Sequence, residues 1–194
     1  MAWRIEIRFV VPDDSRALLD VYAQYVDTPV TFECALPSEH EFSERIAAVS
    51  AWYPWLVCGE GGQIAGYACA HRYMEREAYQ WGAELSVYLD RNHTSRGLGK
   101  RLYRMLMEIL IRQGVRTAYA RVTLPNAGSR ALHESLGFRE VGICRNAGYK
   151  RGTWHDVMWY EKQLAPYDEN PAPLKSVREL PQECLLEMIS QEMR

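Results

Sequence analysis

The sequence predicts an α/β protein in which helices cover both faces of a mixed β-sheet. Stretches that alternate apolar and polar residues, as strands do, are interleaved with stretches in which apolar residues recur every three or four positions, as in helices. The central strands are joined by short turns, whereas the later strands are separated by helices, so both hairpins and crossover connections are expected. The predicted order is β-α-α-β-β-β-α-β-α-β-β.

Seven strands are predicted from short apolar runs bounded by turn residues. They span Arg4 to Val10, Trp55 to Cys58, Ile64 to Ala70, Glu84 to Leu89, Thr117 to Thr123, Phe138 to Cys144 and Trp154 to Tyr160. The second and third strands flank Gly59-Glu60-Gly61-Gly62, whose composition is typical of a hairpin turn. Leu124-Pro125-Asn126 ends the fifth strand, since proline cannot donate to a strand ladder.

Three of the predicted helices carry recognisable start or stop signals. The first follows Pro12-Asp13-Asp14, where an aspartate is suited to cap the helix N-terminus. The second begins at Ser38-Glu39-His40-Glu41, which has the S-x-x-E form of a capping box. A short helix from Gly128 to Leu136 is ended by Gly137.

The remaining helix belongs to a continuous strand, Gly-rich loop and helix between Glu84 and Gln113. Its apolar stripe recurs at helical spacing at Leu98, Leu102, Met105 and Ile109. The loop would aim free backbone N–H groups and the positive end of the helix dipole outward, which suits a phosphate. The loop, RGLGK, matches neither the Walker A spacing nor the dinucleotide-binding fingerprint. A Gly-rich connection with solvated cations is an equally good interpretation of the loop alone.

Composition indicates an ordinary globular protein of one domain, or one domain with an appendage. The chain has 194 residues, 47% of them hydrophobic and 25% charged, with a formal net charge of −2. That charge argues against general affinity for nucleic acid or for an anionic membrane surface. The sequence shows no bilayer-length apolar run, and its N-terminus reads as a strand rather than a signal peptide.

The cysteines favour a reducing compartment, and therefore the cytoplasm. There are five of them, an odd number, at Cys34, Cys58, Cys69, Cys144 and Cys184. None has the spacing of a zinc site, so we expect small buried hydrophobic residues rather than disulfides or metal ligands.

The composition changes after Leu164. Pro166, Pro171 and Pro173 lie among polar residues and indicate a linker, which is followed by a predicted short helix from Leu180 to Arg194. We therefore expect a main domain over residues 1–165 and an appendage over 166–194, docked either on the domain or on a partner chain.

Several motifs together resemble those of the GNAT superfamily of N-acetyltransferases. In chain order they are ELSVYL from Glu84, RGLG from Arg96, NAGS from Asn126 and LHESLGF from Leu132. YPWLV from Tyr53, NAGYK from Asn146 and WHDV from Trp154 are similar to the phosphinothricin acetyltransferase branch, whose relatives also acetylate methionine sulfone and methionine sulfoximine. The resemblance covers about residues 4 to 165 and implies a mostly antiparallel GNAT-type sheet.

The resemblance implies that acetyl-CoA is the co-substrate, with no metal. In this family the pantetheine arm pairs with the backbone after the catalytic strand, and the pyrophosphate lies on the amides of the following loop. Carried over residue by residue, the expected contacts are Val87, Tyr88 and Leu89 for the pantetheine, Ser95, Arg96, Gly97, Leu98, Gly99 and Lys100 for the pyrophosphate, and Asn126 and Ser129 beside them. Thr94 departs from the family pattern, which prefers Gln or Arg there.

Two residues match catalytic positions of the family. Glu84 corresponds to the glutamate that takes a proton from the acceptor ammonium, directly or through a water. The alternative is a strand-end carboxylate paired with a cation. His133 falls where many members carry a tyrosine that protonates the CoA thiolate, although a helix-face histidine is often structural and this leaving group needs no obligatory acid.

The resemblance also implies four residues that recognise the acceptor substrate. Arg76 and Tyr79 match positions that this branch uses for the carboxylate and polar head of the substrate, and Thr31 and Phe32 match the pocket wall. Met74 replaces a lysine of the herbicide-resistance enzymes, which we expect to shift preference from phosphinothricin toward a sulfone, a sulfoximine or a plainer amino acid. In WHDV, adjacent strand residues point to opposite faces, so His155 and Asp156 are interpreted as structural.

The expected function is transfer of an acetyl group from acetyl-CoA to the amine of a small amino-acid-like substrate, by direct attack on the thioester. Two alternatives stay open. One is a GNAT enzyme with another acceptor, such as a protein N-terminus, a ribosomal protein or a polyamine. The other is a non-catalytic acyl-CoA-binding module, against which the presence of both Glu84 and His133 counts. Relatives commonly form homodimers, which the resemblance extends to this chain.

Overall fold

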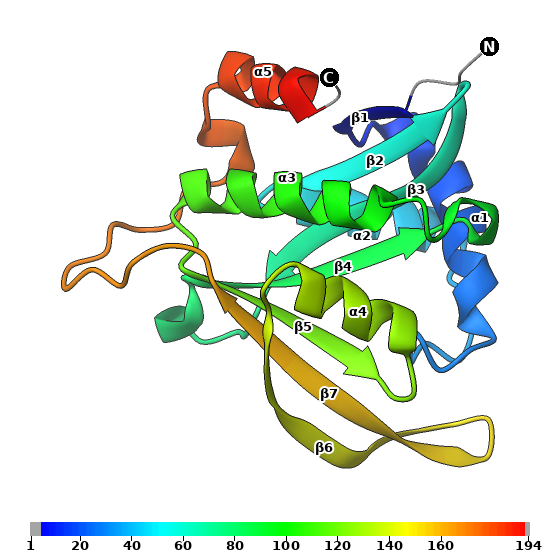
Figure 1. Cartoon of the computed structure of the whole chain (residues 1–194). Coiled ribbons are helices and arrows are strands. Elements are labelled where there is room, and N and C mark those ends of the chain that lie inside the picture. The colour runs from blue at the N-terminus through cyan, green and yellow to red at the C-terminus, as the bar shows by residue number, and fades with distance from the viewer. Residues whose placement is uncertain (1–4, 193–194) are drawn as a thin grey trace.

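The computed structural model describes residues 5–192 and contains one seven-stranded sheet in the order β1-β2-β3-β4-β5-β7-β6 (Figure 1). The strands are β1 (Ile5–Phe9), β2 (Trp55–Glu60), β3 (Gln63–Arg72), β4 (Gly82–Leu89), β5 (Thr117–Thr123), β6 (Arg139–Lys150) and β7 (Thr153–Gln163). The helices are α1 (Ser15–Val26), α2 (Glu39–Ser50), α3 (Leu98–Gln113), α4 (Ala127–Ser135) and α5 (Gln182–Glu192). The predicted order of elements is confirmed. The predicted ends at Arg4 and Arg194 lie outside the described residues.

The central feature of the sheet is the pair formed by β4 and β5. Every other neighbouring pair is antiparallel, but β4 and β5 are parallel, as a helical crossover through α3 requires. Their registered pairing covers only Gly82 to Glu84 on β4 and Thr117 to Tyr119 on β5. Beyond it the two strands diverge, as Figure 1 shows from the left of the pair to the right. The sheet is therefore open along the second half of β4.

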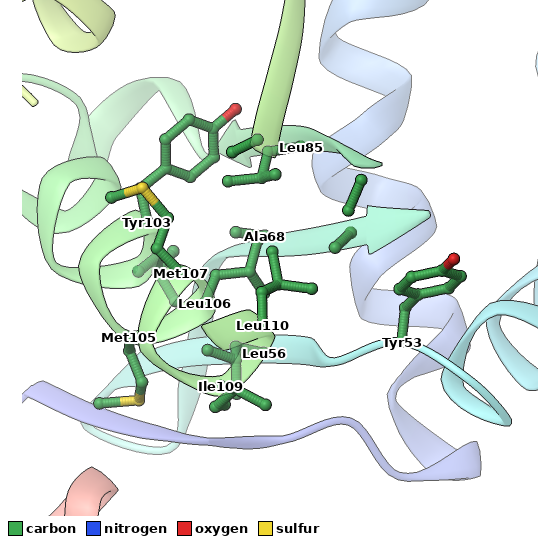
Figure 2. Packing of buried hydrophobic residues seen from close by; sticks show 14 of the residues in the cluster. Tyr53, Leu56, Ala68, Leu85, Tyr103, Met105, Leu106, Met107, Ile109 and Leu110 are labelled. Atoms are coloured by element: carbon green, nitrogen blue, oxygen red, sulfur yellow. The ribbon is translucent and has the colours of Figure 1, made fainter. Parts of the chain in front are cut away.

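The face of the sheet that carries α3 holds the larger core cluster. The α3 side chains predicted to face inward, Leu98, Leu102, Met105 and Ile109, are all buried. Figure 2 shows Leu106 and Leu110 of the same helix against Leu56 and Ala68 of β2 and β3. Gly114 ends the helix with φ of 100°, a left-handed conformation that glycine adopts without strain.

The opposite face is covered by α1 and α2, whose apolar side chains pack on β2, β3 and β4. The core here is aromatic and contains Tyr22, Phe42, Trp55, Tyr67 and Tyr88, with ring centroids 5.0–6.4 Å apart in the contacting pairs. The predicted capping box at the start of α2 is confirmed. Glu41 N–H donates to Ser38 Oγ at 3.2 Å, and Ser38 N–H donates to the Glu41 carboxylate at 2.7 Å.

Two local predictions need correction. The first helix begins with a 3₁₀ turn, and Asp14 makes no side-chain cap because its carboxylate accepts two hydrogen bonds from Arg8, both 2.7 Å long. Strands β6 and β7 are longer than predicted and form one hairpin. A shift in strand register between Cys144 and Gly148, with Asn146 at φ of 49°, lets β6 continue beyond Cys144, where the predicted strand ended.

The residues after Leu164 run back across the molecule and end in α5. Gln113 of α3 donates from its side-chain amide to the carbonyl oxygens of Trp52 and Lys175, at 2.7 and 2.9 Å. The helix α5 lies along α3 (Figure 1), and its Leu185 and Ile189 are buried in the larger core cluster. The sequence left open whether the appendage docks on the main domain or on a partner chain. In the structure it docks on the main domain.

The cysteine prediction is right for two residues and wrong for three. Cys58 and Cys69 are buried, whereas Cys34, Cys144 and Cys184 are exposed, and all five are free thiols. Burial raises the pKa of the Cys58 and Cys69 thiols to about 12, so both stay protonated at neutral pH. Across residues 5–192 no helix is long and apolar enough to cross a membrane.

Candidate active site at the opening between two strands

Glu84 lies at the point where β4 and β5 part. Its neighbours Ala83 and Leu85 face the α3 side of the sheet, so its carboxylate projects from the opposite face, where it is 6% exposed. Arg121 of β5 donates from Nε to Glu84 Oε1 at 2.6 Å. The Arg121 guanidinium in turn lies over the ring of Trp159, 5.5 Å from its centroid. The carboxylate is therefore buried and paired with a cation.

A narrow cleft of about 60 Å³ continues from this point between the two strands. It is lined by both strands and by residues that follow them: Val30, Leu85, Ser86, Val87, Tyr88, Tyr103, Ala120, Arg121, Val122, Thr123, Asn126, Ser129 and His133. Since Arg121 and His133 lie on opposite faces of the sheet, the cleft passes through the sheet. Such a passage lets two molecules meet from opposite sides at the end of the paired region.

His133 of α4 is buried on the α3 side of this passage, at 2% exposure. Its Nδ1 is 2.7 Å from the carbonyl oxygen of Ser129, which can only accept, so Nδ1 carries the proton. Nε2 is buried without a hydrogen-bond partner among the described residues. Burial lowers the pKa of His133 more than the Ser129 hydrogen bond raises it, so the neutral imidazole presents a lone pair at Nε2.

The loop before α3 has the geometry of an anion cradle. Gly97 is the N-cap residue with φ of 79°, and it offers no side chain to cap the first helical N–H groups. Ser95 is also left-handed, with φ of 60°. Arg96 donates through both terminal nitrogens to Glu60 of β2, at 2.7 and 2.8 Å, so its guanidinium ties the loop to the neighbouring hairpin.

Asn126 and Ser129 have defined local roles at the other rim of the cleft. Asn126 caps α4, because its side-chain oxygen accepts from the Ser129 N–H at 3.0 Å. Ser129 in turn orients His133 through its carbonyl oxygen. Both predicted residues lie in the cleft lining. At the far end of β4, the Tyr25 hydroxyl donates a hydrogen bond of 2.5 Å to the Leu89 carbonyl oxygen.

The four predicted acceptor residues are not gathered in one place. Thr31 is buried and bonds to Tyr22, at 2.6 Å between the two hydroxyl oxygens, while Phe32 packs over Gly148 at the end of the β6–β7 hairpin. Arg76 is exposed at the start of a 3₁₀ turn, and Tyr79 of that turn lines a separate cavity of about 230 Å³. Only Val30, next to Thr31, reaches the cleft itself.

The two residues of the WHDV motif interpreted as structural bond to different partners. Asp156 accepts from the Arg145 side chain at 2.6 Å and from the Asn146 N–H at 2.9 Å, and His155 lies 3.3 Å from the Lys150 carbonyl oxygen. They form no catalytic dyad with each other. Across the described residues, no three His, Cys, Asp or Glu side chains cluster as a metal-ligand group.

Arg121 and Trp159 are the site residues that sequence reasoning missed. Their signal was present in β5, where apolar Ala118, Ala120 and Val122 alternate with Tyr119 and Arg121. That alternation assigns Arg121 to the face of the sheet away from the core. It does not reveal that the parallel register brings Arg121 to Glu84.

The comparison with known proteins decides the family. Residues 7–159 match a family model described as an acetyltransferase (GNAT) domain. The chain belongs to the GNAT family. It is 36% identical over 179 residues to phosphinothricin N-acetyltransferase of Streptomyces viridochromogenes, covering 92% of this chain and 96% of that protein. It is 30% identical over 169 residues to the L-methionine sulfoximine/L-methionine sulfone acetyltransferase of Salmonella typhimurium, covering 86% and 97%.

Solved structures show the same GNAT fold. A GNAT superfamily phosphinothricin acetyltransferase from Sinorhizobium meliloti, in complex with acetyl-CoA, has a TM-score of 0.81 at 29% identity and covers 91% of this chain and 100% of its own. The yncA protein of Salmonella typhimurium, solved with its cofactor acetyl-CoA, has a TM-score of 0.80 at 29% identity and covers 88% and 98%. The predicted fold class and the prediction of a GNAT N-acetyltransferase are confirmed.

Proposed function

We propose that this GNAT enzyme transfers an acetyl group from acetyl-CoA to the α-amino group of a small amino-acid-like acceptor. Phosphinothricin, methionine sulfone and methionine sulfoximine are the type of acceptor that its relatives' names indicate. The observation that carries the proposal is the buried Glu84 carboxylate, which is bonded to Arg121 in the lining of a cleft that passes through the sheet. A base at that position can serve an amine that enters from the face opposite α3.

The residues present fit acetyl-CoA as the acyl donor. The uncapped N–H groups at the start of α3 would hold the pyrophosphate, and the unpaired edge of β4 from Ser86 to Leu89 would align the pantetheine arm. Acetyl-CoA supplies an activated thioester carbonyl. Glu84 removes a proton from the acceptor ammonium, and the backbone N–H near Val87 would stabilise the developing oxyanion.

His133 is assigned to the thioester side of the cleft. Its neutral tautomer can accept a hydrogen bond at Nε2, and it can donate a proton from Nε2 only after the imidazole is protonated. The general-acid role therefore stays a prediction. If it is correct, kcat should fall as the pH rises through the pKa of His133, and His133→Gln should remove that dependence.

The decisive measurement is release of free CoA with a panel of amines, for the wild type and for Glu84→Gln. The panel contains phosphinothricin, methionine sulfone, methionine sulfoximine, spermidine and a short peptide with a free N-terminus. We expect turnover with the amino-acid acceptors and a loss of about 10²- to 10⁴-fold in kcat for Glu84→Gln at neutral pH. Glu108→Gln, on the exposed side of α3, is the matched control and should behave as wild type.

Other outcomes of the panel separate the alternatives. Turnover confined to spermidine or the peptide would assign a different acceptor class. No CoA release with any amine, although acetyl-CoA raises the melting temperature, would favour an acyl-CoA-binding module. Full activity of Glu84→Gln would show that another group is the base.

We further propose a homodimer located in the cytoplasm, without nucleic-acid or membrane partners. The β6–β7 hairpin supports the dimer, because it exposes the apolar side chains of Val141, Ile143, Tyr149 and Trp154. Light scattering during size-exclusion chromatography measures the mass directly, and a monomer at micromolar concentration would contradict the proposal.

A further inference from the structure

The geometry points to a role for Arg121 in recognising the acceptor: its guanidinium binds the α-carboxylate while Glu84 takes the α-ammonium. The Glu84–Arg121 ion pair would then match the two opposite charges of an α-amino acid. The substrate would need a free carboxylate beside its amine. This inference rests on the proposed function and narrows its substrate class.

Glu84 bonds to only one of the three nitrogens of the Arg121 guanidinium. Arg121 reaches Glu84 through Nε, and within residues 5–192 its two terminal nitrogens make no hydrogen bond. Two other arginines of this protein make bidentate ion pairs instead. Arg8 and Arg96 each give both terminal nitrogens to one carboxylate, that of Asp14 and Glu60 respectively. Arg121 therefore keeps available the planar N–H fork that matches a carboxylate.

The position and the exposure of Arg121 also suit it to bind a carboxylate. The side chain of Arg121 is 49% exposed and lines the cleft, whereas the Glu84 side chain is 8% exposed. Trp159 supports the guanidinium from one side and limits how it can turn. The fork is thus accessible, oriented and directly beside the base. Arg76, the residue expected to bind the carboxylate, is exposed but is absent from the cleft lining.

An α-amino acid presents two opposite charges side by side. Its ammonium and carboxylate are carried on one carbon, so they can be matched only by an anion and a cation that are themselves adjacent. The 2.6 Å contact between Arg121 Nε and Glu84 Oε1 provides such a pair. A bound carboxylate would also compete with Glu84 for the positive charge of Arg121, which weakens the hold of Arg121 on Glu84. An amine without a carboxylate would leave that hold intact.

The test compares one acceptor with and without its carboxylate. We expect the wild type to prefer methionine sulfone over methionine sulfone α-carboxamide in kcat/KM by about 10- to 100-fold or more, as for a charge-assisted bidentate contact. Arg121→Gln should abolish most of this preference, chiefly by raising KM for the acid. Arg121→Lys should restore part of it, because the charge returns without the fork.

A control variant and a binding measurement complete the design. Arg112→Gln, at an exposed position of α3, should leave the preference unchanged. Methionine sulfone, with CoA present, should raise the melting temperature of the wild type and not that of Arg121→Gln, while acetyl-CoA should raise the melting temperatures of both. The acetyl-CoA shift verifies that the variant is folded with an intact donor site.

The outcomes separate this inference from the proposed function. If the wild type acetylates methionine sulfone and Arg121→Gln keeps the full preference for the acid, the role of Arg121 is overturned and the proposed function stands. If Arg76→Gln abolishes the preference and Arg121→Gln does not, Arg76 is the carboxylate ligand. If the wild type acetylates neither compound nor any other amino acid, the proposed function fails and the inference fails with it.

Discussion

His133 shows how one buried side chain can be neutral and yet sensitive to pH. Its ring stacks on Tyr160, with centroids 5.2 Å apart, and is 2% exposed, so water cannot solvate an imidazolium there. The Ser129 carbonyl offers the ring one acceptor, which offsets only part of the desolvation cost. A proton taken up at Nε2 would have no acceptor among the described residues.

This predicts a loss of stability between pH 7.5 and pH 5.5. The folded-state pKa of His133 is below its ordinary value of about 6.5, so the unfolded chain binds more protons in this window and gains stability as the pH falls. The loss in the free energy of unfolding is at most about 1.4 kcal/mol for one histidine over this range. Urea unfolding at the two pH values measures it.

His133→Gln should remove this part of the pH dependence, and His40→Gln is the matched control. The His40 side chain is 83% exposed beside Glu44, so its removal should leave the dependence close to that of the wild type. The hydrogen-bonded carboxylates of Asp14 and Glu60 have lowered pKa values and stay ionised throughout the window. An unchanged slope in His133→Gln would contradict the assignment.

At the scale of elements, the loop before α3 is fixed by the hairpin that joins β2 and β3. Glu60 lies at the end of β2 and receives both terminal nitrogens of Arg96, and His93 lies 3.4 Å from the same carboxylate. The hydrogen bonds from Arg96 hold the pKa of Glu60 below its usual range, so the contact persists at any pH at which the enzyme would be assayed. Both terminal nitrogens of Arg96 are bonded to Glu60 and are not free to bind a phosphate. The ion pair therefore acts by positioning the backbone of the loop.

Glu60→Gln is therefore expected to raise KM for acetyl-CoA and leave KM for the acceptor unchanged. Because the pair is close to the surface, the rise should be about twofold to fivefold. Arg96→Gln should give a similar rise, and the double variant should add little, as expected for partners in one contact. Glu44→Gln, on the exposed side of α2, is the control. A lower KM in Glu60→Gln would mean that freeing Arg96 improves phosphate binding, and would contradict this prediction.

For the whole molecule, the sequence predicted those features that depend on residues close to one another in the chain. The helix stripe from Leu98 to Ile109 and the capping box at Ser38 are short-range patterns, and both were confirmed. The contact of Arg121 with Glu84 depends on which residues of β4 and β5 face each other, which no local pattern encodes. The motif resemblance supplied Glu84 and the loop, because family motifs carry tertiary information that periodicity does not.

The tail is the other feature that the sequence left open, and it lies on the outer side of α3. Leu185 of α5 is 1% exposed within the larger core cluster, whereas its neighbour Leu186 is 59% exposed. The α5 helix therefore forms a further layer that packs on α3. The α5 helix is short, so its own stability depends on this docking.

Leu185→Ala and Leu186→Ala form a matched pair that tests this layer. Leu185→Ala should lower the free energy of unfolding by about 2–4 kcal/mol, because it removes buried methyl groups and leaves a cavity between α5 and α3. Leu186→Ala, with the same chemistry on the exposed side, should change it by no more than about 0.5 kcal/mol. Urea unfolding gives both values, and kcat/KM well below the melting temperature should be unchanged in both variants. Equal and small effects would show that α5 does not contribute to the core in solution.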